Sequence, residues 1–194
     1  MMVWQHIDTQ MVAFAPTLIS EVKLSHAMAI QLGTSIAADV QFLSVEQKAK
    51  ILSTSPVTLQ DRLIELTAFQ QWMDYAHTIQ NNRSVTRAQV LTQNYICFVY
   101  LPEACFRVLS KECPRDSAAA KCAKFLSDFP VRAFRNAVAH SNWAYRPDFG
   151  AITYWARKDS DLNGPLQKYE IEQSVLGFWQ ALSRCVAYVA YSNL

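Results

Sequence analysis

The chain has 194 residues, and its 18 Lys and Arg against 16 Asp and Glu give a formal net charge of +2. Hydrophobic residues make up 51% of the chain and charged residues 18%, so it is not an intrinsically disordered protein. The small charge excess argues against a protein that holds nucleic acid by bulk electrostatics, and the presence of only 4 glycines argues against a turn-rich all-β fold and a dinucleotide-binding loop. We therefore expect one mostly helical domain over residues 1–194.

Apolar residues at three- and four-residue spacing predict a first helix over Thr17–Leu32, and Gly33 is expected to end it. Ser44 and Gln47 are spaced as a capping box, in which a hydroxyl and a side-chain amide three residues later satisfy each other's backbone N–H groups. A short helix should therefore run from there to about Leu52.

A longer helix should begin at Thr58, because this residue can cap the apolar three-and-four pattern that follows it. Residues 81–84 break the pattern, and the next helix is predicted over Thr86 to about Tyr100. Pro102 should kink or end that helix, since proline lacks the backbone N–H that a helix needs, with helical structure continuing over residues 103–111.

Two short helices are predicted after a turn at residues 113–116. Ser117 is placed to open the first of them, which runs through Phe125. Pro130 is placed as the first residue of the second, which spans Val131 to about His140.

After Trp143 the sequence becomes rich in β-forming residues, and strong turn residues at 163–165 predict a β-hairpin from about 151 to 172. Ser174 should start the last helix, whose only charged residue is Arg184. A central arginine disfavours a membrane span, so we expect a buried helix that is compatible with a dimer interface. The predicted fold class is mainly all-α, an antiparallel helical bundle with a small β-hairpin inserted before the C-terminal helix.

The cysteines are odd in number and include no CxxC pair: Cys97, Cys105, Cys113, Cys122 and Cys185. A disulfide framework needs an even set and an oxidising compartment, so we expect reduced, buried thiols in a cytoplasmic protein. Residues 1–8 lack the charged start and apolar run of a signal peptide. No cysteine or histidine pattern has metal-ligand spacing, so neither a metal nor another cofactor is expected.

One segment, residues 129–143, combines ionisable groups, polar neighbours and a helix. Arg135 and His140 lie five positions apart, which on an ideal helix is about 140° of rotation and about 7.5 Å of rise. The two side chains do not stack on one another, but both can border one cleft that crosses the helix end. Asn136 directly follows the arginine.

The run Arg135-Asn136-Ala137-Val138-Ala139-His140 resembles the motif of the HEPN superfamily, in which four to six residues separate an arginine from a histidine and a polar residue usually follows the arginine. The predicted bundle, the late position of the motif and the closing helix are similar to that superfamily as well. Many of its members are endoribonucleases with paired sites in homodimers. The resemblance implies a HEPN-like bundle that cleaves RNA as a homodimer, in toxin–antitoxin, antiviral defence or RNA-processing systems, with a neutralising antitoxin as a further partner.

Metal-free RNA cleavage needs a base for the 2′-hydroxyl, an acid for the leaving 5′ oxygen and a cation for the phosphoryl oxygens. Imidazole, with an ordinary pKa of ~6.5, serves either proton-transfer role, and guanidinium binds phosphate in bidentate fashion. These tasks fit His140 and Arg135 as catalytic residues, with Asn136 in a supporting role. One chain supplies one such histidine, so two simultaneous proton transfers favour a two-fold homodimer.

Other interpretations stand beside this hypothesis. Arg135 could pair with a carboxylate, and His140 could cap the helix. The aromatic residues of 143–155 could stack RNA bases, with Asn142 and Arg146 as RNA contacts, or could pack the hairpin on the bundle. The alternative functions are a non-catalytic HEPN-like module that binds a nucleotide or a protein, and a helical partner-binding protein without a site.

Overall fold

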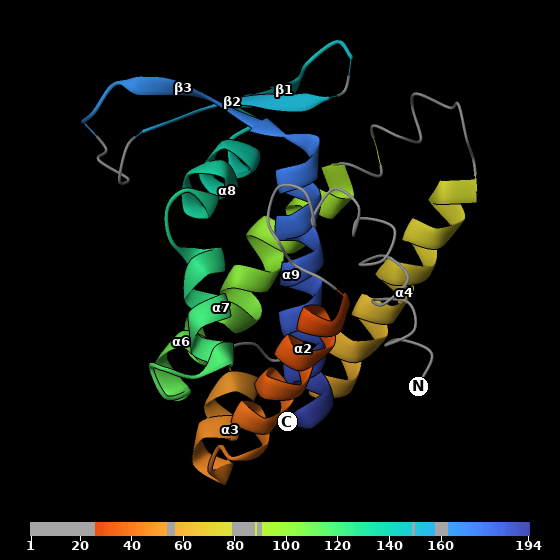
Figure 1. The fold of residues 1–194 in the computed structure, drawn as a ribbon, viewed down its shortest axis with the longest axis vertical. Helices are drawn as coiled ribbons and strands as arrows, with labels where there is room; N and C mark the ends of the chain where they lie inside the picture. The colour runs from red at the N-terminus through yellow and green to blue at the C-terminus, as the bar shows by residue number, and fades with distance from the viewer. Residues whose placement is uncertain (1–25, 54–56, 79–87, 89–90, 149, 158–162) are drawn as a thin grey trace.

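The computed structural model describes residues 26–53, 57–78, 88, 91–148, 150–157 and 163–194. Its helices form a bundle around α9 (Gln173–Asn193), and a small antiparallel sheet lies across the end at which α9 begins (Figure 1). The predicted combination of a mainly helical fold with a small sheet before the last helix is therefore confirmed.

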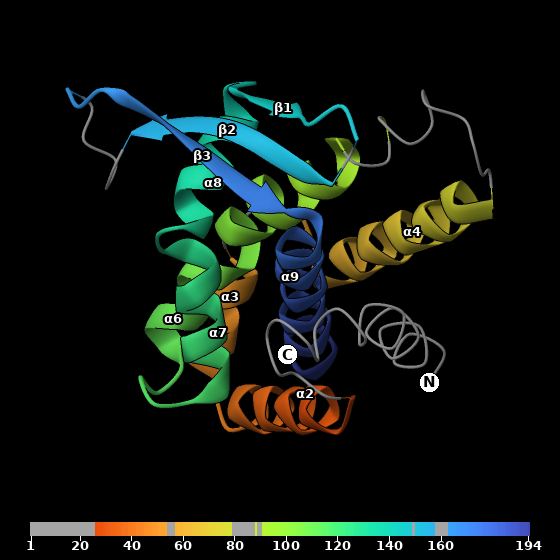
Figure 2. The ribbon, with the colours of Figure 1, turned by 45° about the horizontal axis from the view of Figure 1, so that its top comes forward.

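The first described helix, α2 (His26–Gln41), crosses α9 near the end of the chain (Figure 2). Gly33 was expected to end this helix, but it lies inside it, and residues 17–25 of the predicted helix lie outside the described part of the chain. Gly33 shares a buried stripe with Ile36 and Val40. Burial of this stripe offsets the roughly 1 kcal/mol that a mid-helix glycine costs, so the helix continues.

The start signals of the next two helices are confirmed. In α3 (Val45–Leu52) the Ser44 hydroxyl accepts from the Gln47 N–H, and the Gln47 side chain accepts from the Ser44 N–H. Before α4 (Leu59–Thr78), the Thr58 hydroxyl oxygen accepts a 3.1 Å hydrogen bond from the Asp61 N–H. The predicted break at 81–84 lies outside the described residues.

Pro102 does not end its helix. Residues 91–95 are α-helical and continue into two π-helical turns, η1 (Ile96–Tyr100) and η2 (Pro102–Phe106), and then into α6 (Arg107–Glu112). The wider turns accommodate a residue that cannot donate to the fourth carbonyl before it. Ser183 of α9 donates a 2.8 Å hydrogen bond to the Cys97 carbonyl and so ties η1 to the centre of the bundle. The predicted start at Thr86 lies outside the described residues.

Two short helices lead to the motif. The Ser117 hydroxyl caps α7 (Ala118–Ser127), as predicted, by accepting from the Ala120 N–H. Helix α8 (Val131–Ala139) begins one residue after Pro130, which occupies the cap position and not the first helical position. It ends at Ala139, one residue earlier than predicted, so His140 is its C-terminal cap.

The predicted hairpin is present as β2 (Ala151–Arg157) and β3 (Leu166–Glu172), and an additional strand, β1 (Trp143–Tyr145), makes the sheet three-stranded with order β1-β2-β3. Tyr154 faces Trp143 on one side and Tyr169 on the other, which fixes the register of all three strands. The additional strand extends the sheet towards the end of α8.

Helix α9 is a buried helix, as predicted. From Leu176 to Tyr191 nearly all its side chains are buried within the chain, against α2, α4, α7 and η1. Its low charge therefore reflects a central position in the bundle. None of the helices in the described ranges is long and apolar enough to cross a bilayer.

The cysteines follow the prediction of buried thiols. All five are free, four are buried, and Cys122 is half-buried. Burial raises the pKa of the Cys97 thiol to about 11 and that of the Cys105 thiol to about 12. These thiols are therefore protonated and weakly nucleophilic at neutral pH.

A second apolar core holds α8 between the sheet and the bundle. Phe134, fully buried on α8, packs edge-on against Phe98 of η1 and Tyr154 of β2, with 5.2 Å between ring centroids in each pair. Trp179 of α9 and Ile152 of β2 belong to the same cluster. Because these residues come from four elements, the core fixes the end of α8 relative to the sheet.

Candidate functional site

The end of α8 is a left-handed cap with full hydrogen bonding. The Asn142 N–H donates to the Ala137 carbonyl at 2.8 Å, and the Ser141 N–H donates to the Val138 carbonyl at 3.3 Å, which is the Schellman pattern. Ser141 holds φ at 57°, in the left-handed region that favours glycine. A non-glycine residue there costs roughly 1 kcal/mol, so this turn stores strain next to His140.

Backbone pairing attaches this turn to the sheet. The Trp155 N–H of β2 donates to the Asn142 carbonyl at 2.9 Å, immediately before β1 pairs with β2 from Trp143 onward. The turn after α8 and the middle of β2 are therefore held at fixed separation. A hollow remains between them.

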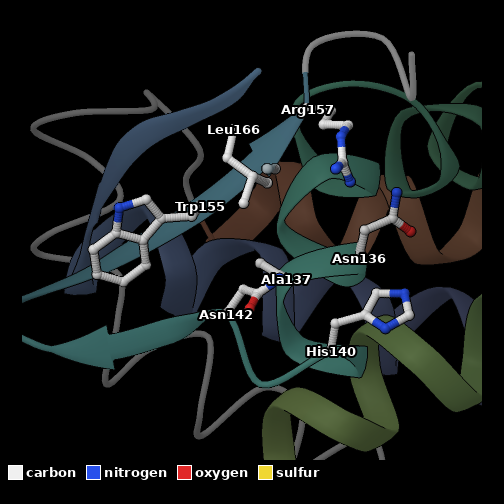
Figure 3. Close-up of a pocket in the computed structure, with 8 residues that line it drawn as sticks. Asn136, Ala137, His140, Asn142, Trp155, Arg157 and Leu166 are labelled. Atoms are coloured by element: carbon white, nitrogen blue, oxygen red, sulfur yellow. The ribbon is translucent and has the colours of Figure 1, made fainter. Parts of the chain in front are cut away.

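This hollow, here called the His140 pocket, has a volume of about 280 Å³. Its polar lining comes from Asn136, His140 and Asn142 at the end of α8 and from Arg157 of β2. Figure 3 shows the Asn136 amide and the His140 ring on the same side of α8, one above the other, with the Arg157 guanidinium reaching towards Asn136. The remaining lining is mainly apolar: Ala137, Trp155, Ala156 and Leu166.

The chemical content of the His140 pocket suits a phosphate ester. The exposed imidazole can take or give a proton, the amides of Asn136 and Asn142 can donate to oxygens, and the Arg157 guanidinium can neutralise negative charge. Arg157 also donates from Nε to the Gly164 carbonyl at 2.9 Å, and among the described residues no acceptor binds its terminal nitrogens.

Arg135 does not line the His140 pocket. Its guanidinium forms an ion pair with Oε1 of Glu103, while Oε2 of the same carboxylate binds Arg107. Arg135 is 30% exposed in this arrangement and lines a second pocket with Glu103 and Arg107. Within one chain, therefore, Arg135 and His140 border different hollows on different sides of α8.

The two residues predicted to contact RNA, Asn142 and Arg146, also lie in different places. Asn142 lines the His140 pocket, whereas Arg146 does not. Arg146 is bound by carboxylates of Asp148 at 2.7 Å and Glu170 at 3.1 Å, with Glu172 at 3.8 Å. The hydrogen bond from Arg146, together with one from the Gly150 N–H, lowers the pKa of the Asp148 carboxyl to about 2.

Of the aromatic residues after the motif, some pack in the core and one lines the His140 pocket. Tyr154 is buried, stacks on Tyr169 of the same hairpin with 5.3 Å between centroids, and contacts Phe134 of α8, so it packs the hairpin on the bundle. Trp155, the next residue, is 37% exposed and forms a wall of the His140 pocket. Arg157 was not among the predicted site residues, although strand alternation places it on the same face as Trp155. The alternation of side chains along β2 is therefore the sequence signal that groups Arg157 with Trp155.

Within the described ranges, no cluster of three or more His, Cys, Asp and Glu side chains is arranged to hold a metal ion. Comparison of the chain with protein-family models, curated proteins and solved structures gave no match. The functional assignment therefore depends on the residues around α8 and on the motif they form.

Proposed function

We propose that the protein is a metal-independent endoribonuclease in which His140 transfers the proton at the scissile phosphodiester. The observation that carries the proposal is the His140 pocket, where an exposed imidazole, two amides and a guanidinium surround a hollow of about 280 Å³. This set of groups suits the base or acid, hydrogen-bond donors and cation that attack by a 2′-hydroxyl requires.

In this reaction the ribose 2′-oxygen attacks phosphorus while a base removes its proton. The bond from phosphorus to the 5′ oxygen breaks, and an acid protonates that oxygen. The products are a 2′,3′-cyclic phosphate and a 5′-hydroxyl, so no water and no oxidant are consumed. Asn136, one helical turn before His140, supports the reaction by donating its amide to the ring or to a phosphoryl oxygen.

A composite homodimer site follows from the separation of Arg135 and His140. Because the two side chains of one chain border different pockets, a site that uses both requires a second copy of the chain. In the proposed dimer the ends of two α8 helices face each other, so His140 of one protomer works with Arg135 of its partner. Arg135 then exchanges the Glu103 carboxylate for the scissile phosphate.

The test compares RNA cleavage in EDTA by the wild type and by His140→Ala, Arg135→Ala, Asn136→Ala and Arg157→Ala. Loss of general acid–base catalysis is worth about 10²–10⁴-fold, so His140→Ala should lose at least about a hundredfold in rate. Arg115→Ala, in the exposed turn between α6 and α7, is the matched control for loss of one arginine and should cleave like the wild type. Equal cleavage by all the variants would refute the proposal.

Mixing the two inactive variants tests the composite site separately. Co-expressed His140→Ala and Arg135→Ala chains form mixed dimers in half of the assemblies, and each mixed dimer has one intact site. Activity should return to about a quarter of the wild-type rate. A mixture as inactive as either variant alone would show that the site lies within one chain.

The Glu103–Arg135 ion pair favours a second candidate, a non-catalytic module that binds a nucleotide or a protein partner. In that case Arg135 is structural, and Arg135→Ala lowers stability without affecting any turnover. If the protein is an endoribonuclease, His140→Ala should instead lose turnover and keep its stability, because this exposed side chain contributes little to folding.

A further inference from the structure

A second hollow lies beside α8, separate from the His140 pocket. It has a volume of about 310 Å³ and is here called the arginine pocket. Arg132 and Arg135 enter it from α8, Arg107 from the start of α6, and Glu103 from η2. Ser127, the last residue of α7, completes its polar lining.

The arginine pocket has an excess of positive charge. Three guanidinium groups and one carboxylate line it, and Glu103 pairs with only two of them, those of Arg107 and Arg135. Within the described part of the chain, Arg132 is the arginine of this pocket that pairs with no carboxylate. Arg132 and Arg135 are three positions apart on α8 and therefore lie on neighbouring parts of one helix face.

Hydrogen-bond donors of this pocket also lack acceptors. Arg135 Nε and the Ser127 hydroxyl are buried and have no hydrogen-bond partner among the described residues. A buried donor without an acceptor is unfavourable, and a phosphate group has enough oxygens to satisfy several donors at once. The pocket therefore has both the charge and the donors that an anion requires.

We propose that the arginine pocket binds a phosphate group of the RNA strand that flanks the scissile phosphate, with Arg132 and Arg107 as its new binding residues. This inference rests on the proposed function. In the proposed dimer, Arg135 of this pocket binds the scissile phosphate next to His140 of the other protomer. Arg132, three positions before Arg135 on the same face of α8, then holds the flanking phosphate.

Glu103 competes with this phosphate. Its carboxylate occupies two of the three guanidinium groups when no strand is bound, and a phosphate must displace it. Removing the negative charge while keeping the shape of the side chain should therefore strengthen binding. Glu103→Gln is the variant that separates this competition from a purely structural role.

The experiment measures equilibrium binding of a 2′-O-methyl RNA oligonucleotide, which cannot be cleaved, as a function of salt. Arg132→Ala should bind about tenfold more weakly, and the slope of log affinity against log salt should fall by about 0.7, the value for one phosphate contact on a single strand. Arg107→Ala should act in the same direction, Glu103→Gln should bind more tightly, and the control Arg115→Ala should match the wild type.

The outcomes separate this inference from the proposed function. Cleavage by the wild type with unchanged oligonucleotide binding by Arg132→Ala and Arg107→Ala would overturn the inference alone. Absence of cleavage with the expected loss of binding would leave the phosphate site standing and overturn the endoribonuclease. Binding of inorganic phosphate that Arg132→Ala abolishes, with no change for the oligonucleotide, would overturn the assignment to an RNA strand.

Discussion

Replacement of Phe134 by alanine is the sharpest test of how the His140 pocket is held. This ring is fully buried and joins α8 to η1 and β2 through edge-on contacts with Phe98 and Tyr154, both at 5.2 Å. A third contact, with Trp179 at 6.2 Å, reaches α9. Truncation to alanine removes all these contacts and leaves a cavity between the helix and the sheet.

The expected loss is at the upper end of the range for buried aromatic residues. A buried Phe→Ala change costs about 3–5 kcal/mol, and each aromatic pair adds about 0.5–1.5 kcal/mol beyond area burial. We therefore expect Phe134→Ala to lower the free energy of unfolding by about 4–5 kcal/mol. Phe42→Ala is the control, because that ring is 89% exposed, and its effect should stay within about 0.5 kcal/mol.

Urea unfolding followed by tryptophan fluorescence measures the free energy of unfolding of both variants. Comparing the slope of this free energy against urea concentration detects changes in the native state. If Phe134→Ala does not fold, Phe134→Leu keeps most of the volume and should lose about 1.5 kcal/mol. A loss below about 1 kcal/mol for Phe134→Ala, at unchanged slope, would refute the claim that this ring anchors α8 to the sheet.

Three further predictions concern the surroundings of the site. Ser141→Gly should raise the free energy of unfolding by about 1 kcal/mol in urea titrations, because glycine relieves the left-handed strain at φ 57°, and a loss of stability would contradict this. Arg146 lowers the pKa of Asp148 in the folded protein to about 2, below its ordinary value of ~3.9. The ion pair therefore stabilises the fold above about pH 4, and this contribution is lost as the pH falls through about 2. Asp148→Asn should therefore have a lower urea midpoint than the wild type near neutral pH, and the gap should close in acid; a gap that stays constant would contradict the assignment. Cys105, with a pKa of about 12, should resist thiol labelling near pH 8 until denaturant is added, and rapid labelling of the native protein would contradict its burial.

Local signals in the sequence predicted the elements that local interactions define. The capping box of Ser44 and Gln47 and the turn residues at 163–165 act over three or four residues, so they can be found without knowledge of the fold. Gly33 does not end its helix, because packing of that helix against α9 outweighs the low helix propensity of glycine. Strand β1 has only three residues and exists through its pairing with β2, which no local pattern reveals.

The candidate site was predictable in part for the same reason. His140 and Asn136 share a pocket because they lie four positions apart at the end of α8, and this spacing can be read from the sequence. Arg157 reaches that pocket only through the register of the sheet, and Glu103 meets Arg135 across 32 positions of chain. Strand alternation places Arg157 on the same face as Trp155 but does not show that this face borders His140, and the contact of Glu103 with Arg135 has no sequence signal.

The chemistry of the cleaved ends tests the central claim most directly. RNA incubated with the wild type in EDTA should give 2′,3′-cyclic phosphate and 5′-hydroxyl ends, since the attacking group is the ribose 2′-oxygen, and the same oligonucleotide with 2′-O-methyl groups should stay intact. His140→Ala should yield at least about a hundredfold less of the cyclic product. Cyclic product formed equally well by His140→Ala, or cleavage of the 2′-O-methyl strand, would contradict the assignment of His140 as the proton-transfer residue of an endoribonuclease.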